Sequence, residues 1–188
     1  IGSTRVYTRF PDDKCSRLAA MSRAVWIQGI PSTILHPTMI YGAPGLNNIE
    51  RIFRIARLSP LIPLPSDGSA LIQPVHVNNV VACIEASLIN PETIGRTIVV
   101  AGMHAVTYRE FIETCIEISE NKCRIISLPY FLISLIGLLT HLVPGIPTVT
   151  QNEIRRLQED KSFDITDLEE RLGVRPYPLR EGLKLAIN

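Results

Sequence analysis

The stretch that decides the fold runs from Ile30 to Gly45 and reads IPSTILHPTMIYGAPG. A short β-branched and apolar run, residues 33–35, leads into His36 and Pro37. Pro37 has no backbone N–H and biases His36 toward an extended conformation, so we expect a strand that stops here. In open α/β sheets, ligands bind where strands end and loops begin. This strand end is therefore the predicted small-molecule site.

Short β-branched runs alternate with longer runs of helical spacing along the rest of the chain. The predicted strands are residues 33–35, 97–100 and 124–127. Residues 16–28 are predicted to form a helix that ends at Gly29, and residues 78–88 a second helix, capped by Asn78 or Asn79. This alternation indicates an α/β fold.

Local signals add helix starts, stops and core positions. Three capping boxes, each a Thr followed three residues later by a Glu, predict helix starts at Thr107/Glu110, Thr150/Glu153 and Thr166/Glu169. Gly173 should end the last of these helices, and Asp67-Gly68 predicts a turn. Trp26 and Phe111 fall on helical faces and are predicted core residues.

Composition narrows the class of protein. Of 188 residues, 46% are apolar and 20% are charged, and the net charge is +1. These values are typical of a folded domain with a sizeable core and give no basic surface for nucleic acid. The four cysteines are scattered without metal-ligand spacing. We therefore expect reduced thiols, no metal site and a cytoplasmic location.

One segment is almost entirely apolar: from Leu128 to Val143 the chain reads LPYFLISLIGLLTHLV. It is shorter than the roughly 20 residues that a membrane-spanning helix needs. We predict a buried helix, or one that contacts a second copy of the chain or a partner subunit, and no transmembrane span. A membrane-surface contact and a true span are the alternatives.

Four short motifs resemble, in the right order, the extended short-chain dehydrogenase/reductase family in its NAD-dependent epimerase/dehydratase branch. They are Ser3-Thr4-Arg5-Val6-Tyr7, the run from His36 to Gly42, the run from Gln73 to Val80, which is similar to the family's His-Val-x-Asp-Val, and Leu172-Gly173-Val174-Arg175-Pro176. The resemblance implies a three-layer Rossmann-like fold with a mostly parallel sheet and a small helical substrate lobe, at about 42–75 and 123–188. It also implies NAD or NADP as cofactor and hydride transfer at a hydroxyl or carbonyl carbon of a small, sugar-like molecule.

The resemblance also assigns catalytic and cofactor roles. Ser3 would orient the reacting oxygen of the substrate, and Lys14 would touch the nicotinamide ribose, so both are expected catalytic residues. Pro37, Thr38 and Met39 would flank the nicotinamide and complete, with Lys14, the cofactor-binding set. For the substrate itself, the expected contacts are Tyr41, Asn47 and His76.

The family's phosphate-binding turn has no counterpart in these residues. The 188 residues contain neither GxGxxG nor GxxGxxG, although a dinucleotide fold needs such a turn so that backbone amides reach the pyrophosphate. Under the resemblance, residues 1–188 are the C-terminal part of one Rossmann-like domain with its substrate lobe. About 110 residues, including the Gly-rich part, would then precede Ile1.

Three positions depart from the family's motifs. Phe10 stands at the spacing of the acid/base Tyr in Tyr-x-x-x-Lys, His36 replaces an Arg, and Ile72 stands where nucleotide-sugar enzymes often carry an Arg. In this the chain resembles the atypical branch that includes a respiratory complex I accessory subunit. A non-catalytic NAD(P)-binding scaffold or assembly subunit is therefore the alternative to an enzyme.

Overall fold

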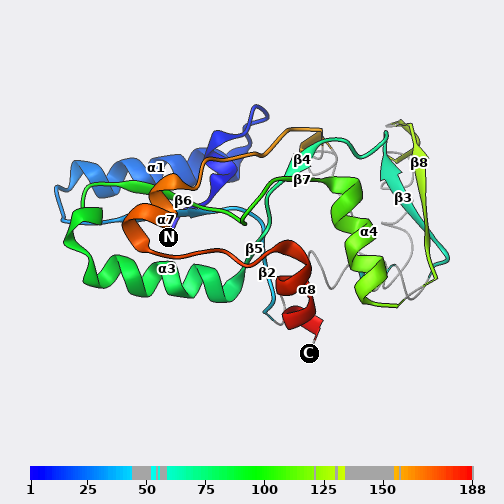
Figure 1. Cartoon of the computed structure of the whole chain (residues 1–188). Helices are drawn as coiled ribbons and strands as arrows, with labels where there is room; N and C mark the ends of the chain where they lie inside the picture. The colour runs from blue at the N-terminus through cyan, green and yellow to red at the C-terminus, as the bar shows by residue number, and fades with distance from the viewer. Residues whose placement is uncertain are drawn as a thin grey trace.

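Strands and helices alternate along the described part of the chain (Figure 1), which confirms the predicted α/β class. The computed structural model describes residues 1–43, 52, 53, 55, 59–120, 122–129, 131–133, 155, 156 and 158–187. Asn47 and the predicted box at Thr150 lie outside these residues, as does most of the apolar segment that begins at Leu128. Among the described residues, no helix has both the length and the apolar character needed to cross a bilayer.

The deciding stretch forms strand β1, Ile34–Pro37, which ends at the predicted proline. β1 pairs in parallel with β6, Thr97–Val100, so both strands end at the same edge. The N–H of Thr38 donates to the carbonyl of Val100 over 3.0 Å and fixes the chain as it leaves β1. All four residues of β1 are buried, as is usual for a parallel strand covered on both faces.

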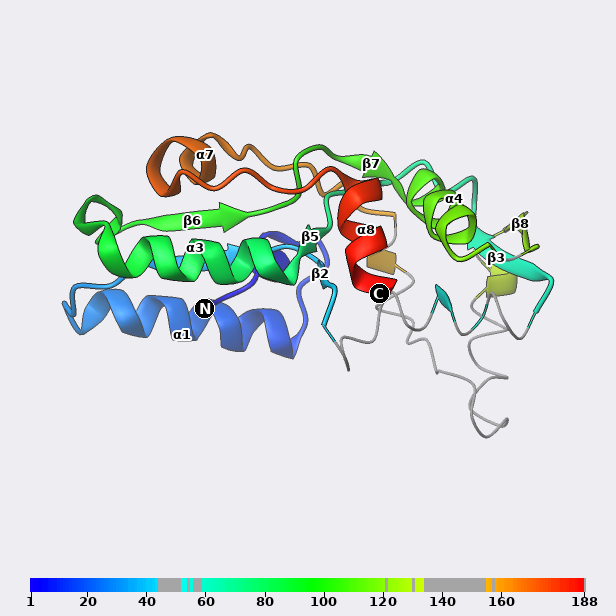
Figure 2. The same cartoon turned by 60° about the horizontal axis from the view of Figure 1, so that its bottom comes forward.

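Three helices surround this strand pair: α1 (Asp13–Ile27), α3 (Val77–Ile89) and α7 (Thr166–Leu172). In both cartoon views α1 and α3 lie beside the pair, and α7 packs against β6 (Figures 1 and 2). Side chains of the strands, α3 and α7 form one buried apolar cluster, which comprises Leu35, Val75, Val80, Cys83, Ile98, Val100, Leu168 and Leu172.

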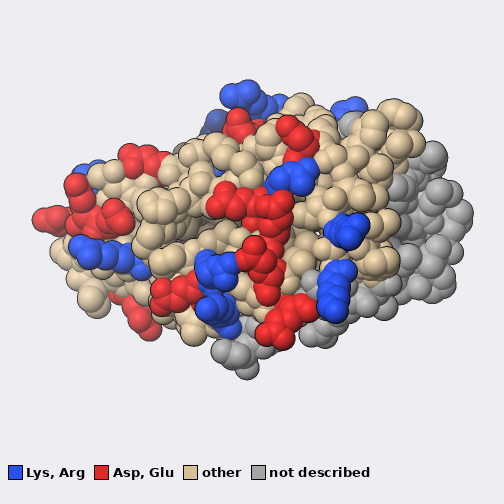
Figure 3. Space-filling model, turned by 45° about the vertical axis from the view of Figure 1, so that its right-hand side comes forward, with Lys and Arg blue, Asp and Glu red and all other residues tan. Residues whose placement is uncertain are grey.

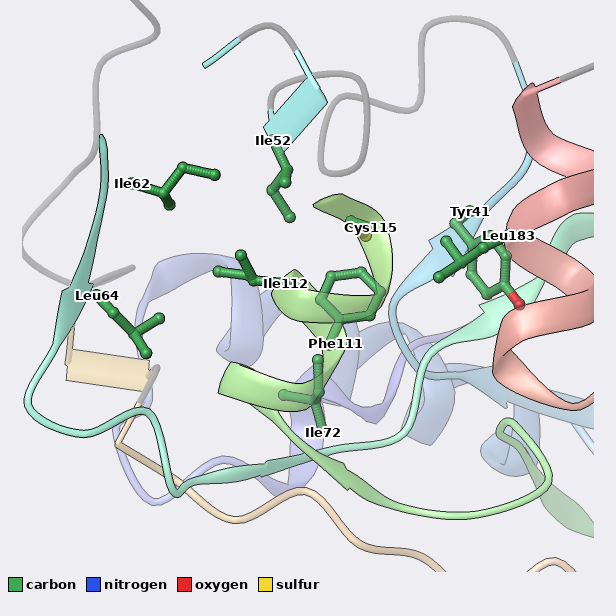
Figure 4. Close-up of a cluster of buried hydrophobic side chains, with 9 residues drawn as sticks. All are labelled: Tyr41, Ile52, Ile62, Leu64, Ile72, Phe111, Ile112, Cys115 and Leu183. Carbon is green, nitrogen blue, oxygen red and sulfur yellow. The ribbon is translucent and has the colours of Figure 1, made fainter. Parts of the chain in front are cut away.

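The other half of the molecule is built around α4, Tyr108–Ile118, and α8, Leu179–Ile187, which contact each other. The strand pairs of this half are β3 (Leu61–Pro65) with β8 (Arg124–Leu128), parallel, and β4 (Leu71–Ile72) with β7 (Val106–Thr107), antiparallel. The second apolar cluster, drawn in Figure 4, comprises Tyr41, Ile52, Ile62, Leu64, Ile72, Phe111, Ile112, Cys115 and Leu183.

Shorter elements complete the described chain. They are the 3-10 helices η1 (Thr4–Tyr7) and η2 (Pro91–Thr93), and the parallel strands β2 (Ile40–Tyr41) and β5 (Val75–His76). β2 and β5 lie between the two halves, because Tyr41 belongs to one apolar cluster and Val75 to the other.

Several boundaries follow their sequence signals. The hydroxyl of Thr107 accepts a hydrogen bond from the N–H of Glu110 over 3.0 Å, which confirms the capping prediction for α4. Gly29 and Gly173 end α1 and α7 with φ angles of 64° and 63°. Only glycine adopts this left-handed backbone without strain.

Two predictions for single residues are wrong. Thr166 is the first helical residue of α7 and not its cap, and Asp164 accepts both its N–H and its hydroxyl. Trp26 is 38% exposed. Of the residues of α1, only Cys15 is buried, so this helix has no continuous buried face on which Trp26 could lie. Phe111, by contrast, is fully buried as predicted.

Two buried thiols behave as small apolar side chains. Burial raises the pKa of both Cys83 and Cys115 to about 12, so each remains protonated at neutral pH. A protonated thiol is neither a nucleophile nor a metal ligand. These two cysteines therefore belong to the packing of the two clusters and not to a reactive site.

Candidate functional site

The predicted cofactor residues lie where β1 and β6 end. The carbonyl of Pro37 accepts a hydrogen bond from the hydroxyl of Thr4 over 3.2 Å. The hydroxyl of Thr38 donates to the carbonyl of Gln73 over 2.5 Å, and Met39 packs against the second apolar cluster. Residues 37–39 are thus held by neighbours from three other parts of the chain.

The buried side-chain amide of Gln73 holds together the backbone next to this strand end, at Gly102, Pro74 and Phe163, which we call the floor of the site. Its Nε2 donates to the carbonyl of Gly102 over 2.7 Å, and its Oε1 accepts from the N–H of Phe163 over 2.8 Å. Gly102 has no room for a side chain, because a Cβ there would lie 2.1 Å from the carbonyl oxygen of Pro74. The floor is therefore close-packed backbone.

Of the two expected catalytic residues, the structure brings one to β1. Gly2 donates its N–H to the carbonyl of Leu35 over 2.8 Å, which places the following residue, Ser3, beside the strand. The hydroxyl of Ser3 caps η1 by accepting from the N–H of Arg5 over 3.2 Å, and its own hydrogen is still free to donate. Lys14 is exposed in the first turn of α1, and no hydrogen bond or ion pair joins it to a described residue.

A pair of residues that the sequence reasoning missed lies at the same strand end. Nδ1 of His36 is 2.9 Å from the hydroxyl of Tyr7, and their rings meet edge to face. His36 is buried, and its Nε2 has no hydrogen-bond partner among the described residues. Burial lowers the pKa of His36 and raises that of the Tyr7 hydroxyl. The only sequence signal for the pair is the His in place of an Arg before Pro37.

His76, an expected substrate contact, also caps α3. Its Nδ1 accepts from the N–H of Asn78 over 3.1 Å, so the prediction that Asn78 or Asn79 is the cap is wrong. The ring stands between Tyr41 and Tyr177, with interplanar angles of 86° and 84°. Because Nδ1 accepts, the proton of the neutral ring is on Nε2, and this buried donor has no partner among the described residues.

Tyr41, a second expected substrate contact, is almost completely buried, with 1% of its surface exposed. Burial raises the pKa of its hydroxyl, so the group stays protonated. A Cβ at Gly182 would lie 2.1 Å from this hydroxyl, which shows how closely α8 approaches it. The substrate roles of Tyr41 and His76 stay predictions.

Asn79 ties α3 to the segment after α7. Its Oδ1 accepts from the N–H of Tyr177 over 3.2 Å, and its Nδ2 lies 3.4 Å from the carbonyl of Arg175. The side chain is buried, and both bonds are partly shielded from water. This network holds Tyr177 against His76.

The loop between η1 and α1 is fastened by charged side chains. Asp12 accepts from Arg5 and, over 2.9 Å, from Arg156, while Glu159 accepts from the hydroxyl of Thr8 over 2.7 Å. The hydrogen-bonded guanidinium of Arg5 holds the pKa of Asp12 well below its usual range. The loop that carries Phe10 is thus fixed to Arg156 and Glu159.

A shallow groove of about 340 Å³ lies between α4 and α8, and none of the predicted site residues lines it. Its lining comprises Val106, Glu110, Glu113, Thr114, Glu117, Leu179 and Arg180. On the face drawn in Figure 3, acidic side chains gather between scattered basic ones. Arg180 forms an ion pair with Glu117 across the groove.

Comparison with known proteins gives two informative relatives, although no family model matches the chain. A 3beta-hydroxysteroid-dehydrogenase/decarboxylase (isoform 2) of Arabidopsis thaliana is 24% identical over 177 residues, covering 85% of this chain and 31% of that protein. The mitochondrial NADH dehydrogenase [ubiquinone] 1 alpha subcomplex subunit 9 of Rattus norvegicus is 31% identical over 121 residues, covering 63% and 32%. The chain spans about a third of the length of these two relatives.

Solved structures show the same fold. A nucleoside-diphosphate-sugar epimerase of Staphylococcus aureus has a TM-score of 0.69 at 16% identity, covering 97% of this chain and 62% of that one. A UDP-glucuronic acid 4-epimerase of Bacillus cereus, in complex with UDP-glucuronic acid and NAD, has a TM-score of 0.64 at 15% identity, covering 98% and 58%. The chain shares the fold of these epimerases and resembles in sequence the dehydrogenase/decarboxylase and the NADH dehydrogenase subunit named above.

Besides His36 and Ile72, two positions depart from the motifs of the short-chain dehydrogenase/reductase family that the chain resembles. Phe10, at the spacing of the acid/base Tyr, is 43% exposed and has no hydroxyl to offer. Asn79 takes the place of the Asp in the family's His-Val-x-Asp-Val, and its amide makes the two bonds described above. Phe10 therefore offers no hydroxyl for proton transfer, whereas the amide of Asn79 holds α3 against the segment after α7.

Proposed function

We propose that this chain forms the nicotinamide and substrate side of an NAD(P)-dependent epimerase/dehydratase or reductase. It would act by hydride transfer on a small molecule that carries a hydroxyl or carbonyl group. One observation supports this most: the parallel strands β1 and β6 end together, and residues 37–39 at that edge are fixed beside Ser3. In the family this edge adjoins the nicotinamide.

The residues present fit the nicotinamide end of the cofactor, because the strand edge is rigid and polar groups surround it. They contain no Gly-rich turn for the pyrophosphate, so we expect the 188 residues alone to bind a dinucleotide weakly. When bound, a nicotinamide accepts or supplies the hydride. Ser3 would donate its hydroxyl hydrogen to the substrate oxygen, and the Nε2–H of His76 would donate to a second polar atom of the substrate.

The alternative is a non-catalytic NAD(P)-binding scaffold or assembly subunit. Two observations favour it: Phe10 lacks the acid/base hydroxyl, and Lys14 has no described contact with the strand end. The similarity to a subunit named for the NADH dehydrogenase 1 alpha subcomplex points in the same direction. Such a subunit would keep the cofactor site and lack turnover.

Measurement of turnover by a full-length protein that contains this chain distinguishes the enzyme from the non-catalytic scaffold. The probes are UDP-glucose, UDP-glucuronic acid and a 3β-hydroxysteroid, taken from the relatives and neighbours. Products of the nucleotide sugars are separated by chromatography, because an epimerase leaves no net reduced nicotinamide, and oxidation of the steroid is followed by the absorbance of reduced nicotinamide. For the enzyme, Ser3→Ala lowers kcat by about tenfold, since it removes a donor aimed at the reacting oxygen. Lys14→Met raises the cofactor KM.

Matched controls are Ser22→Ala on α1 and Lys122→Met before β8, which should behave as wild type. Cofactor binding without turnover of any probe supports the scaffold. Unchanged kinetics in both the Ser3 and the Lys14 variant contradict the residue assignment.

A further inference from the structure

Tyr7 and His36 form a hydrogen-bonded pair with one member in water and the other in the interior. Tyr7 is 50% exposed and His36 is 4% exposed, and 2.9 Å separates the hydroxyl from Nδ1. The far nitrogen, Nε2, faces Gly2, where a Cβ would come within 2.6 Å of it. A half-exposed tyrosine whose hydroxyl touches a buried base can carry protons between a bound molecule and the interior.

Three observations place this pair at the predicted cofactor edge. His36 is the residue before Pro37, the last residue of β1. Thr4, in the same 3-10 turn as Tyr7, donates to the carbonyl of Pro37. Ser3, the expected ligand of the substrate oxygen, caps that turn. The Tyr7 hydroxyl therefore belongs to the same strand end as the expected hydride-transfer residues.

The pair also supplies what the rest of the site lacks. Phe10 has no hydroxyl at the position of the family's acid/base Tyr, and Lys14 makes no described contact that would activate one. His36 stands where the family's motif carries an Arg. A guanidinium cannot accept a proton, whereas a neutral imidazole can. The chain thus lacks a hydroxyl at Phe10 and carries at His36 a side chain that can accept a proton.

We propose that Tyr7 is the proton-transfer residue of this site and that His36 receives the proton from it; this rests on the proposed function. In oxidation of an alcohol, a bound nicotinamide would supply the hydride acceptor. The alcohol proton would move to the Tyr7 oxygen as the proton of Tyr7 moves to Nδ1 of His36. The alcohol would become a carbonyl by losing its hydride to the cofactor, and the imidazolium of His36 would hold the proton. Reduction of a carbonyl follows the same path backwards.

The protonation state of His36 suits this role. Burial lowers its pKa, so the ring is neutral at pH 7. In the tautomer with its proton on Nε2, the lone pair of Nδ1 faces the Tyr7 hydroxyl. Below the pKa of His36 the lone pair is occupied, so turnover should fall at acid pH.

The test uses the full-length protein, NAD⁺ or NADP⁺ and the three probes named above. Tyr7→Phe should lower kcat by about 100-fold or more and leave cofactor affinity unchanged, because general acid/base groups contribute about that much. His36→Asn keeps a polar group beside Tyr7 but cannot take a proton. It should lower kcat similarly and remove the fall at acid pH. Tyr108→Phe, on α4, is the matched control and should behave as wild type.

A readout on the wild-type protein does not depend on whether the variants fold. In ¹⁵N-histidine NMR, Nδ1 of His36 should show the shift of an unprotonated acceptor at neutral pH. A protonated Nδ1 overturns the proposal, as does a Tyr7→Phe kcat within about threefold of wild type. Cofactor binding with no turnover of any probe also overturns it, whereas failure to bind cofactor contradicts the proposed function instead.

Discussion

Replacement of Asn79 tests the account of how α3 is held in place. Asn79→Ala removes two partly buried hydrogen bonds, to the N–H of Tyr177 and the carbonyl of Arg175. Each such bond is worth about 1 kcal/mol net, and a buried group left without a partner costs about 1–3 kcal/mol. We therefore expect the free energy of unfolding to fall by about 2–4 kcal/mol.

The neighbouring Asn78 is the matched control, because it is exposed and was the other predicted cap. Asn78→Ala should change the free energy of unfolding by less than about 0.5 kcal/mol, as for most surface changes. Urea titrations of both variants, followed by circular dichroism, give the comparison. Equal losses for the two variants, or no loss for Asn79→Ala, would refute this reasoning.

Two further predictions concern the floor and the charged loop. Gly102→Ala should lower the free energy of unfolding by about 1–3 kcal/mol in the same assay, because the new methyl group meets the carbonyl oxygen of Pro74. An unchanged free energy of unfolding would show that the backbone around Pro74 can move aside to accept the methyl group. The pKa of Asp12 is lowered by its bond to Arg5, so its contribution to stability is present above about pH 4 and is lost as the pH falls further. The difference in urea midpoint between wild type and Asp12→Asn should therefore stay constant above about pH 5 and shrink between about pH 4 and pH 2, and a constant difference over that lower range would contradict the ion pair.

The sequence predicted the elements whose signals are local. The proline at the end of β1, the β-branched run of β6 and the glycines that end α1 and α7 each restrict the backbone at their own position, so they could be recognised without a fold. The cap of α3 was mispredicted because two asparagines compete at its start. Tertiary contacts use Asn79 elsewhere and leave the helix N-terminus to His76.

Residues of the site that depend on distant contacts were not predictable in this way. Tyr7 and His36 are 29 positions apart, and no spacing rule relates a 3-10 turn to a strand end. Glu159 meets Thr8 across 151 positions, so the fastening of the loop that carries Phe10 appears only in the fold. Trp26 shows the converse, since its helical spacing suggested burial and the described chain leaves it partly exposed.

The central claim is that residues 37–39 border a bound nicotinamide. Hydrogen–deuterium exchange of the full-length protein, with and without saturating NAD⁺ or NADP⁺, tests it directly. We predict slower exchange in the peptide that covers residues 34–41, at the ends of β1 and β2, and no change in the β3–β8 pair. Cofactor binding that leaves residues 34–41 unprotected, or no binding of either dinucleotide, would contradict the account.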